Sequence, residues 1–129
     1  MSYTKSVTLE DDFQTAVDRT REVLSEEGFG VITEVDVAQI FAEKIDEDVD
    51  EYQILGACNP QKAFEGIELE TELGALLPCN VVVYEDGEDV VVSAVDPTVL
   101  IDVTGNDDLD DIARDIDERF DRVLATLED

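Results

Sequence analysis

Residues 53–84, QILGACNPQKAFEGIELETELGALLPCNVVVY, contain both cysteines of the chain and its most informative pattern of turns and strands. Each cysteine is followed directly by an asparagine, and each Cys-Asn pair has a proline beside it. The two motifs are formed by Cys58, Asn59 and Pro60 and by Pro78, Cys79 and Asn80. Asparagine and proline are favoured where helices and strands begin. We therefore expect both cysteines to lie at strand ends.

Secondary structure can be predicted outward from these two boundaries. Alternating or β-branched apolar residues predict strands over residues 2–9, 30–35, 52–57, 79–85 and 89–95. Helices are predicted after Asp11 or Asp12, after Asp36, after Asn59, and over residues 107–127. An Asp-Gly pair at positions 86–87 is typical of a tight hairpin between the last two strands. The segment 98–103, after Asp96-Pro97, could extend the sheet or cross over it.

The order strand, helix, strands, short helices, hairpin and C-terminal helix is typical of an α+β fold. We expect a mainly antiparallel sheet with the helices packed on one face. No repeat or linker divides the 129 residues, so a single domain, 1–129, is predicted. Such a small domain leaves a sheet edge or a sheet face uncovered, which favours a homodimer.

The charge of the chain is strongly unbalanced. It has 35 acidic residues and 8 basic ones, for a formal net charge of -27, and the acids are spread along the whole length. This distribution on a globular sequence is typical of a surface suited to high salt, where the screening length falls to roughly 3 Å at 1 M. The alternative is an acidic protein that mimics or binds a basic partner. We predict a halophilic protein and assign most carboxylates to solvation.

The composition also excludes several classes of function. The chain has no histidine, which excludes His-based catalysis and His-ligated metals. It has no basic patch for nucleic acid, and no apolar run approaches the roughly 20 residues of a membrane span. The N-terminus lacks the pattern of a signal peptide, so we predict a soluble, cytoplasmic protein. No acid–base pair stands out from the acidic background, and enzyme activity stays uncertain.

Three interpretations of Cys58 and Cys79 are open from the sequence. They could be two inert core residues, since free cysteine is among the most buried residue types. They could form a thiol or metal site, although two thiolates supply only half of a tetrahedral zinc site and would need a second chain or oxygen ligands. They could form a disulfide, which a cytoplasmic location disfavours.

The local context of the two motifs favours a site. Cys58 is predicted to precede a helix N-terminus, whose free N–H groups and dipole favour a thiolate and lower the thiol pKa. Asn80 is predicted inside an apolar strand, where a buried amide needs partners. The candidate ligand-binding residues are Cys58, Asn59, Pro60, Cys79 and Asn80, and the candidate metal ligands are Cys58 and Cys79. The sequence identifies no cofactor.

Residues 52–60, YQILGACNP, and 74–81, GALLPCNV, resemble the signature of the domain of unknown function family 302. The flanking strand and helices also fit, so the resemblance covers most of the chain. It implies a small homodimeric α+β domain with helices on one side of a curved antiparallel sheet, and no established activity. The signature residues present here are Gly56, Cys58, Asn59, Pro60, Leu77, Pro78, Cys79 and Asn80.

Two functional hypotheses follow. In the first, the two Cys-Asn motifs meet in one pocket that binds a small molecule or a soft metal, or performs thiol chemistry with Cys58 as the reactive thiolate. In the second, the chain is a non-catalytic homodimeric structural or interaction module whose cysteines are buried and inert.

Overall fold

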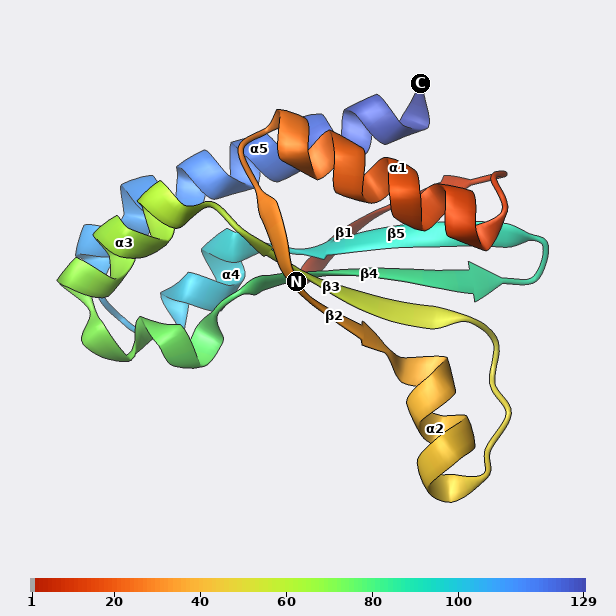
Figure 1. The fold of residues 1–129 in the computed structure, drawn as a ribbon. Coiled ribbons are helices and arrows are strands. Elements are labelled where there is room, and N and C mark those ends of the chain that lie inside the picture. The colour runs from red at the N-terminus through yellow and green to blue at the C-terminus, as the bar shows by residue number, and fades with distance from the viewer. Residues whose placement is uncertain (1) are drawn as a thin grey trace.

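Five antiparallel strands form a single sheet in the order β1-β5-β4-β3-β2 (Figure 1). The computed structural model describes residues 2–129. The strands are β1 (Thr4–Leu9), β2 (Gly30–Asp36), β3 (Tyr52–Cys58), β4 (Cys79–Asp86) and β5 (Asp89–Val95). Every predicted strand is present, and the α+β class with its predicted element order is confirmed.

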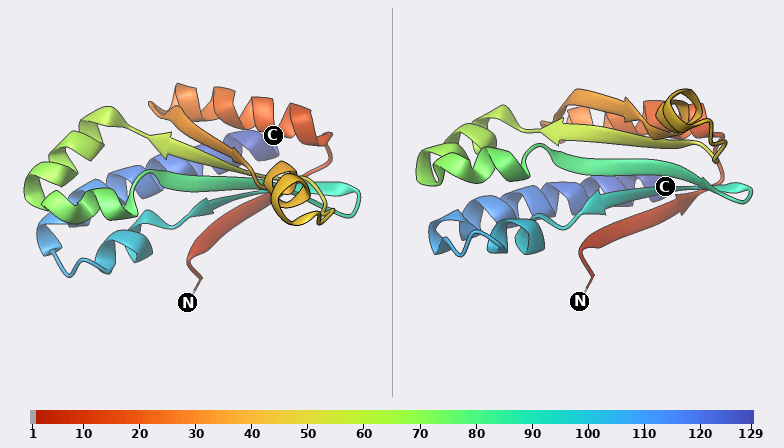
Figure 2. Two further views of the ribbon diagram at one scale, coloured as in Figure 1. Left: turned by 60° about the horizontal axis from the view of Figure 1, so that its bottom comes forward. Right: turned by 90° about the horizontal axis from the view of Figure 1, so that it is seen from below.

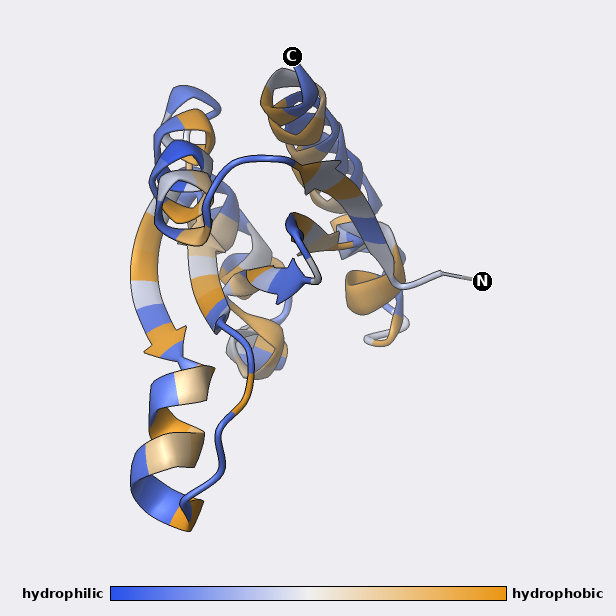
Figure 3. Ribbon diagram, turned by 90° about the vertical axis from the view of Figure 1, so that its right-hand side faces the viewer, coloured by the Kyte–Doolittle hydropathy of each residue, from blue (hydrophilic) through white to orange (hydrophobic). Residues whose placement is uncertain are grey.

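The described residues form five helices, and the two long ones cover one face of this sheet. The helices are α1 (Phe13–Glu26), α2 (Val37–Ile45), α3 (Pro60–Leu69), α4 (Pro97–Asp102) and α5 (Asp110–Glu128), with 3-10 turns η1 (Thr71–Leu76) and η2 (Asp107–Leu109). The long helices α1 and α5 contact each other and lie on the same side of the sheet. In the right-hand view of Figure 2 both of them are behind the strands. Helix α2 instead projects from the end of β2 (Figures 1 and 3). No helix within residues 2–129 is long and apolar enough to cross a membrane.

Two of the predicted helix starts have side-chain caps, whereas Asp12, the N-cap residue of α1, makes no capping hydrogen bond with its side chain. The Asp36 Oδ1 accepts a hydrogen bond from the Gln39 N–H at 3.0 Å, and the Asn59 Oδ1 accepts one from the Lys62 N–H at 3.1 Å. Each cap satisfies a backbone donor that the first helical turn leaves without a partner. Gly28 follows α1 with φ 87°, the left-handed conformation that favours glycine. The helix starts predicted after Asp36 and Asn59 are therefore confirmed.

The segment after Asp96 differs from the sequence prediction. It neither extends the sheet nor crosses over it, because residues 97–102 form helix α4. The Asp96 Oδ1 accepts hydrogen bonds from the N–H groups of Thr98, at 2.9 Å, and Val99, at 3.4 Å. Asp-Pro acts here as Asn59-Pro60 does at α3: an N-cap is followed by a proline at the first helical position.

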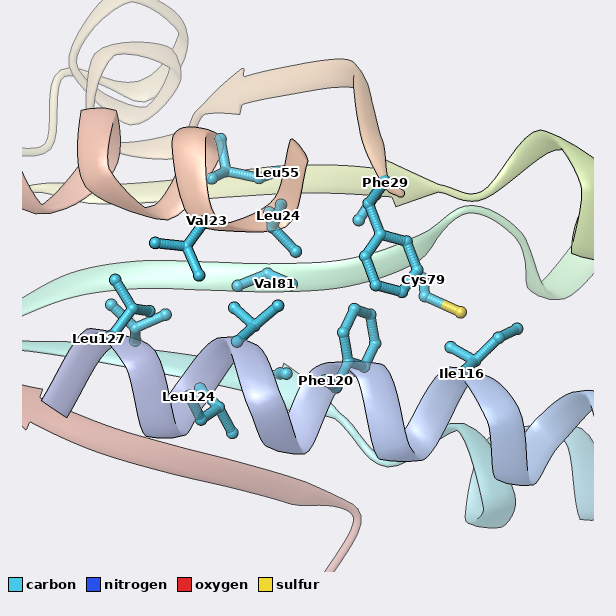
Figure 4. Close-up of a cluster of buried hydrophobic side chains, with 14 of the residues drawn as sticks. Val23, Leu24, Phe29, Leu55, Cys79, Val81, Ile116, Phe120, Leu124 and Leu127 are labelled. Atoms are coloured by element: carbon cyan, nitrogen blue, oxygen red, sulfur yellow. The ribbon is translucent and has the colours of Figure 1, made fainter. Parts of the chain in front are cut away.

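The core lies between the sheet and the two long helices (Figure 4). The predicted apolar stripe of the last helix is buried along its whole length: Leu109, Ile112, Ile116, Phe120, Val123 and Leu127. Phe120 stacks on Phe29, with ring centroids 4.8 Å apart. Cys79 lies beside Phe29 in this cluster and faces α5 (Figure 4). The N-terminal end of β4 is thus part of the core.

Candidate functional site

The pairing of β3 with β4 brings the two cysteines together. Ala57 is opposite Cys79 in the ladder, so Cys58 is one residue from the position that faces Cys79. Both cysteines line a small cavity of about 20 Å³, together with Asn59 and Pro78. Both thiols are free, so no disulfide joins them. The ladder register and the shared lining therefore place Cys58 and Cys79 close together.

Burial controls the acidity of both thiols. Desolvation raises the pKa of Cys79 to about 11, and the neighbouring Cys58 contributes to the same shift. Burial also raises the pKa of Cys58, the opposite of the lowering predicted from its place before α3. The Asn59 side chain already occupies a donor at that helix N-terminus, and the apolar surroundings disfavour a thiolate. Both cysteines are therefore protonated near neutral pH.

These raised pKa values predict slow thiol chemistry in the folded protein. At pH 7.5 and 2 M NaCl, reaction with a disulfide reagent should be far slower than after denaturation. Because the folded pKa is raised, thiolate forms only as the pH climbs through 9 and beyond, so the rate should rise about tenfold per pH unit from 7.5. Cys58, which is half-buried, should react before Cys79, as Cys58→Ala and Cys79→Ala variants would show. A rapid burst from folded protein at pH 7.5 would contradict this prediction.

The surroundings of the cysteines limit what could bind between them. A cavity of about 20 Å³ has room for roughly one water molecule. Within residues 2–129, no group of three or more Cys, Asp or Glu side chains is placed to hold a metal ion. A tetrahedral site on Cys58 and Cys79 would therefore need ligands from a second copy of the chain.

The remaining candidate residues lie outside this cavity. Pro60 is exposed at the start of α3. Asn80 is exposed as well, because alternation along β4 turns it to the face opposite Cys79. The prediction of a buried amide in this strand is therefore wrong, and Asn80 lines a shallow hollow on the other side of the sheet. The five candidate residues do not form a single pocket.

Gly56 connects the two motifs. It pairs with Asn80 in the ladder between β3 and β4. A Cβ atom at this position would lie 2.7 Å from Pro78 Cγ and would also collide with Thr33 Oγ1. Because glycine has no Cβ, Pro78 can pack directly against β3. The segment that leads into Cys79 therefore also lies close to β3.

The sheet face opposite α1 and α5, here called the open face, carries no helix of the layer that α1 and α5 form. The sequence predicts an uncovered sheet edge or face, but it does not identify the residues that form it. Strand alternation and register place these residues on it: Thr4, Ser6, Thr8, Thr33, Val35, Tyr52, Ile54, Gly56, Asn80, Val82, Tyr84, Val91, Ser93 and Val95. None of these is charged, although 33% of the chain is charged. The next ladder pair along the hairpin, Asp86 opposite Asp89, marks where charge resumes.

A larger cavity lies at one end of the open face, between α2 and the strands β3 and β4. This α2 cavity has a volume of about 710 Å³. Its apolar lining comes from both sides: Val35, Val37, Ile40, Phe41, Val49, Tyr52, Ile54 and Tyr84. The rings of Tyr52 and Tyr84 are stacked, with centroids 5.7 Å apart. Its charged lining is acidic: Asp50, Glu51 and Glu85.

This arrangement defines a small α+β fold with a half-buried and a buried cysteine at one end of the sheet and an open face without charge up to the hairpin end. Comparison with protein families assigns residues 5–127 to a domain of unknown function, DUF302, and the chain belongs to that family. The predicted resemblance is thereby confirmed.

Comparisons with individual proteins agree with this family. A crystal structure of an uncharacterised conserved DUF302 protein from Bacillus stearothermophilus is similar, with 29% sequence identity and a TM-score of 0.91. The match covers 97% of this chain and 98% of the Bacillus chain. No curated protein matches this chain.

Proposed function

We propose that this chain is a non-catalytic interaction domain that works as a homodimer, with the open faces of two copies in contact. The observation that carries this proposal is the absence of charge from the open face, among the described residues, up to the Asp86–Asp89 ladder pair at the hairpin end. Valine, isoleucine and tyrosine alternate there with serine and threonine, a mixture that packs without leaving a charge unpaired. A face exposed to solvent in so acidic a chain would be expected to carry carboxylates as the remaining surface does.

A second copy of the chain is the partner that this face fits best. Two chains of net charge -27 repel each other wherever their acidic surfaces meet. The open face is the surface on which two copies can touch without bringing carboxylates together. A basic partner would instead be expected on a surface dense in carboxylates.

The cysteine pair has a structural role in this proposal. The raised pKa values of Cys58 and Cys79 and their small cavity support inert core packing more than a thiol or soft-metal site. The net charge of -27 supports a setting of high salt, and we place the homodimer in a salt-rich cytoplasm.

A charge introduced on the open face tests the homodimer. Val82 is central on that face, opposite Ile54 on one side and Ser93 on the other. Val82→Asp would bury one unpaired carboxylate per copy, so the dimer dissociation constant should rise at least about 100-fold. Sedimentation velocity over a concentration series in 2 M NaCl measures this change.

The matched control introduces the same charge elsewhere. Val103, at the end of α4, is 77% exposed and lies outside the open face. Val103→Asp should leave the dimer unchanged, and thermal melts of both variants show whether they are folded. The proposal fails if wild type is monomeric at all concentrations, or if the two variants weaken the dimer equally.

A further inference from the structure

We propose that the α2 cavity binds a lipophilic organic cation, that is, a molecule with a bulky apolar body and a positive centre. This site goes beyond the proposed homodimer and rests on different observations: the volume, the apolar walls and the sign of the charge of one cavity.

The volume and walls of the cavity suit a small organic molecule. About 710 Å³ falls in the range of roughly 300–1,000 Å³ that is typical of small-molecule sites. Ile40 and Phe41 of α2 face Ile54 of β3 across it. Ile40 is 41% exposed and Phe41 39% exposed, so both side chains retain apolar surface that a ligand would remove from water.

The charged groups of the lining select the sign of the ligand. Asp50, Glu51 and Glu85 contribute carboxylates, and no lysine or arginine lines the cavity. Glu85 is fixed in place, since its Oε1 accepts the Glu51 N–H at 3.0 Å. Lys44 of α2 is exposed and is not part of the lining. An anion of the same size would therefore be repelled, while a cation would be attracted by these acidic residues, of which Glu85 has a hydrogen-bonded carboxylate.

The aromatic groups favour a cation over a neutral molecule of the same shape. Tyr52 and Tyr84 stack at the boundary between the cavity and the rest of the open face, and Phe41 lies in the α2 wall. Positive charge over the face of an aromatic ring is stabilised by the negative electrostatic potential of that face. A ligand whose positive centre is surrounded by its own apolar groups can contact the apolar walls, the aromatic rings and the carboxylates at the same time.

The experiment uses two probes of the same shape and opposite charge, tetraphenylphosphonium and tetraphenylborate. Calorimetric titration of the full chain in 1 M NaCl should show one tetraphenylphosphonium bound per chain. The affinity for tetraphenylborate should be at least tenfold weaker. Equal or tighter binding of tetraphenylborate overturns the proposal, and so does the absence of binding by tetraphenylphosphonium at millimolar concentration.

Paired variants localise the binding. Glu51→Gln with Glu85→Gln should weaken tetraphenylphosphonium binding about tenfold, since two neighbouring carboxylates are lost. Glu118→Gln with Glu128→Gln changes the net charge equally on exposed positions of α5, and should change the affinity less than twofold. Phe41→Ala should also weaken binding. Equal effects of the two double variants overturn the assignment to this cavity.

The same titration shows whether the α2 cavity is free to bind a small molecule or is filled by a second copy of the chain. The cavity shares Val35, Tyr52, Ile54 and Tyr84 with the open face, which is the proposed dimer surface. Binding by both the wild type and Val82→Asp supports the inference, whatever the oligomeric state of either. Binding by Val82→Asp alone would mean that a partner copy fills the cavity, and would overturn it.

Discussion

Replacing Phe120 with alanine is expected to lower the free energy of unfolding by about 3–5 kcal/mol. Phe120 is 1% exposed and stacks on Phe29, which joins α5 to the segment between α1 and β2 (Figure 4). Removal of the ring leaves a cavity among residues that the sheet and two helices hold in place, so the core cannot close around it. Urea unfolding at a constant 2 M NaCl measures the change, since salt then screens both proteins equally.

The matched control is the same substitution at an exposed phenylalanine. Phe64 of α3 is 62% exposed, so Phe64→Ala should change the free energy of unfolding by less than about 1 kcal/mol. Similar losses in the two variants would mean that the packing described for α5 is not what stabilises the fold.

Periodicity in the sequence predicted the elements whose environment repeats regularly. The stripe of α5 recurs at three and four residues, and all its members are buried on one helix face. The hairpin of β4 and β5 has β-branched strands around Gly87, which takes the left-handed φ of 65° that its turn requires. Asn59-Pro60 fixes the start of α3 by a hydrogen bond that is local in sequence.

Features that depend on tertiary packing could not be read in this way. The pKa of Cys58 follows from apolar neighbours supplied by other elements, and these outweigh the local helix N-terminus. From the sequence, the segment after Asp96-Pro97 is expected to extend the sheet or cross over it, although Asp-Pro, like Asn59-Pro60 at α3, is a pattern that caps a helix. The capping pattern alone could have predicted α4 from the sequence. The environment of Cys58, in contrast, depends on residues that only the fold brings together.

The open face shows why register is needed before a surface can be recognised. Val82 and Tyr84 are two residues apart in one apolar run, and nothing local says which face each one occupies. Only the ladder partners Ile54 and Ser93 place Val82 on the uncharged side. Likewise, the spacing of Val37, Ile40 and Phe41 fits a helix but does not say that α2 projects from the sheet and forms a cavity.

The ion pairs of the structure leave most of its negative charge uncompensated. Within residues 2–129, seven of the eight basic residues form ion pairs, and these involve nine of the 35 acidic residues. Lys5, for example, bridges Asp117 at 2.7 Å and Asp121 at 3.0 Å, which ties β1 to α5. The remaining carboxylates repel one another over the surface, and salt is what weakens that repulsion.

Lowering the salt concentration from 2 M to 0.05 M NaCl should therefore lower the melting temperature by about 10 °C or more. For a chain of this length, that corresponds to roughly 2–3 kcal/mol. The loss should be steepest below about 0.5 M, because the screening length is already near 3 Å at 1 M and approaches 30 Å at 0.01 M. Thermal unfolding followed by circular dichroism over this range measures the effect.

A non-electrolyte separates screening from general stabilisation by solute. Sucrose at matched osmolarity raises stability by exclusion from the protein surface, but it does not screen charge. It should therefore recover only a small part of the loss in 0.05 M NaCl. Neutralising exposed carboxylates, as in Glu118→Gln with Glu128→Gln, should reduce the salt dependence without affecting the core. A melting temperature that is the same at low and high salt would show that the acidic surface is not an adaptation to salt, and would favour a basic partner instead.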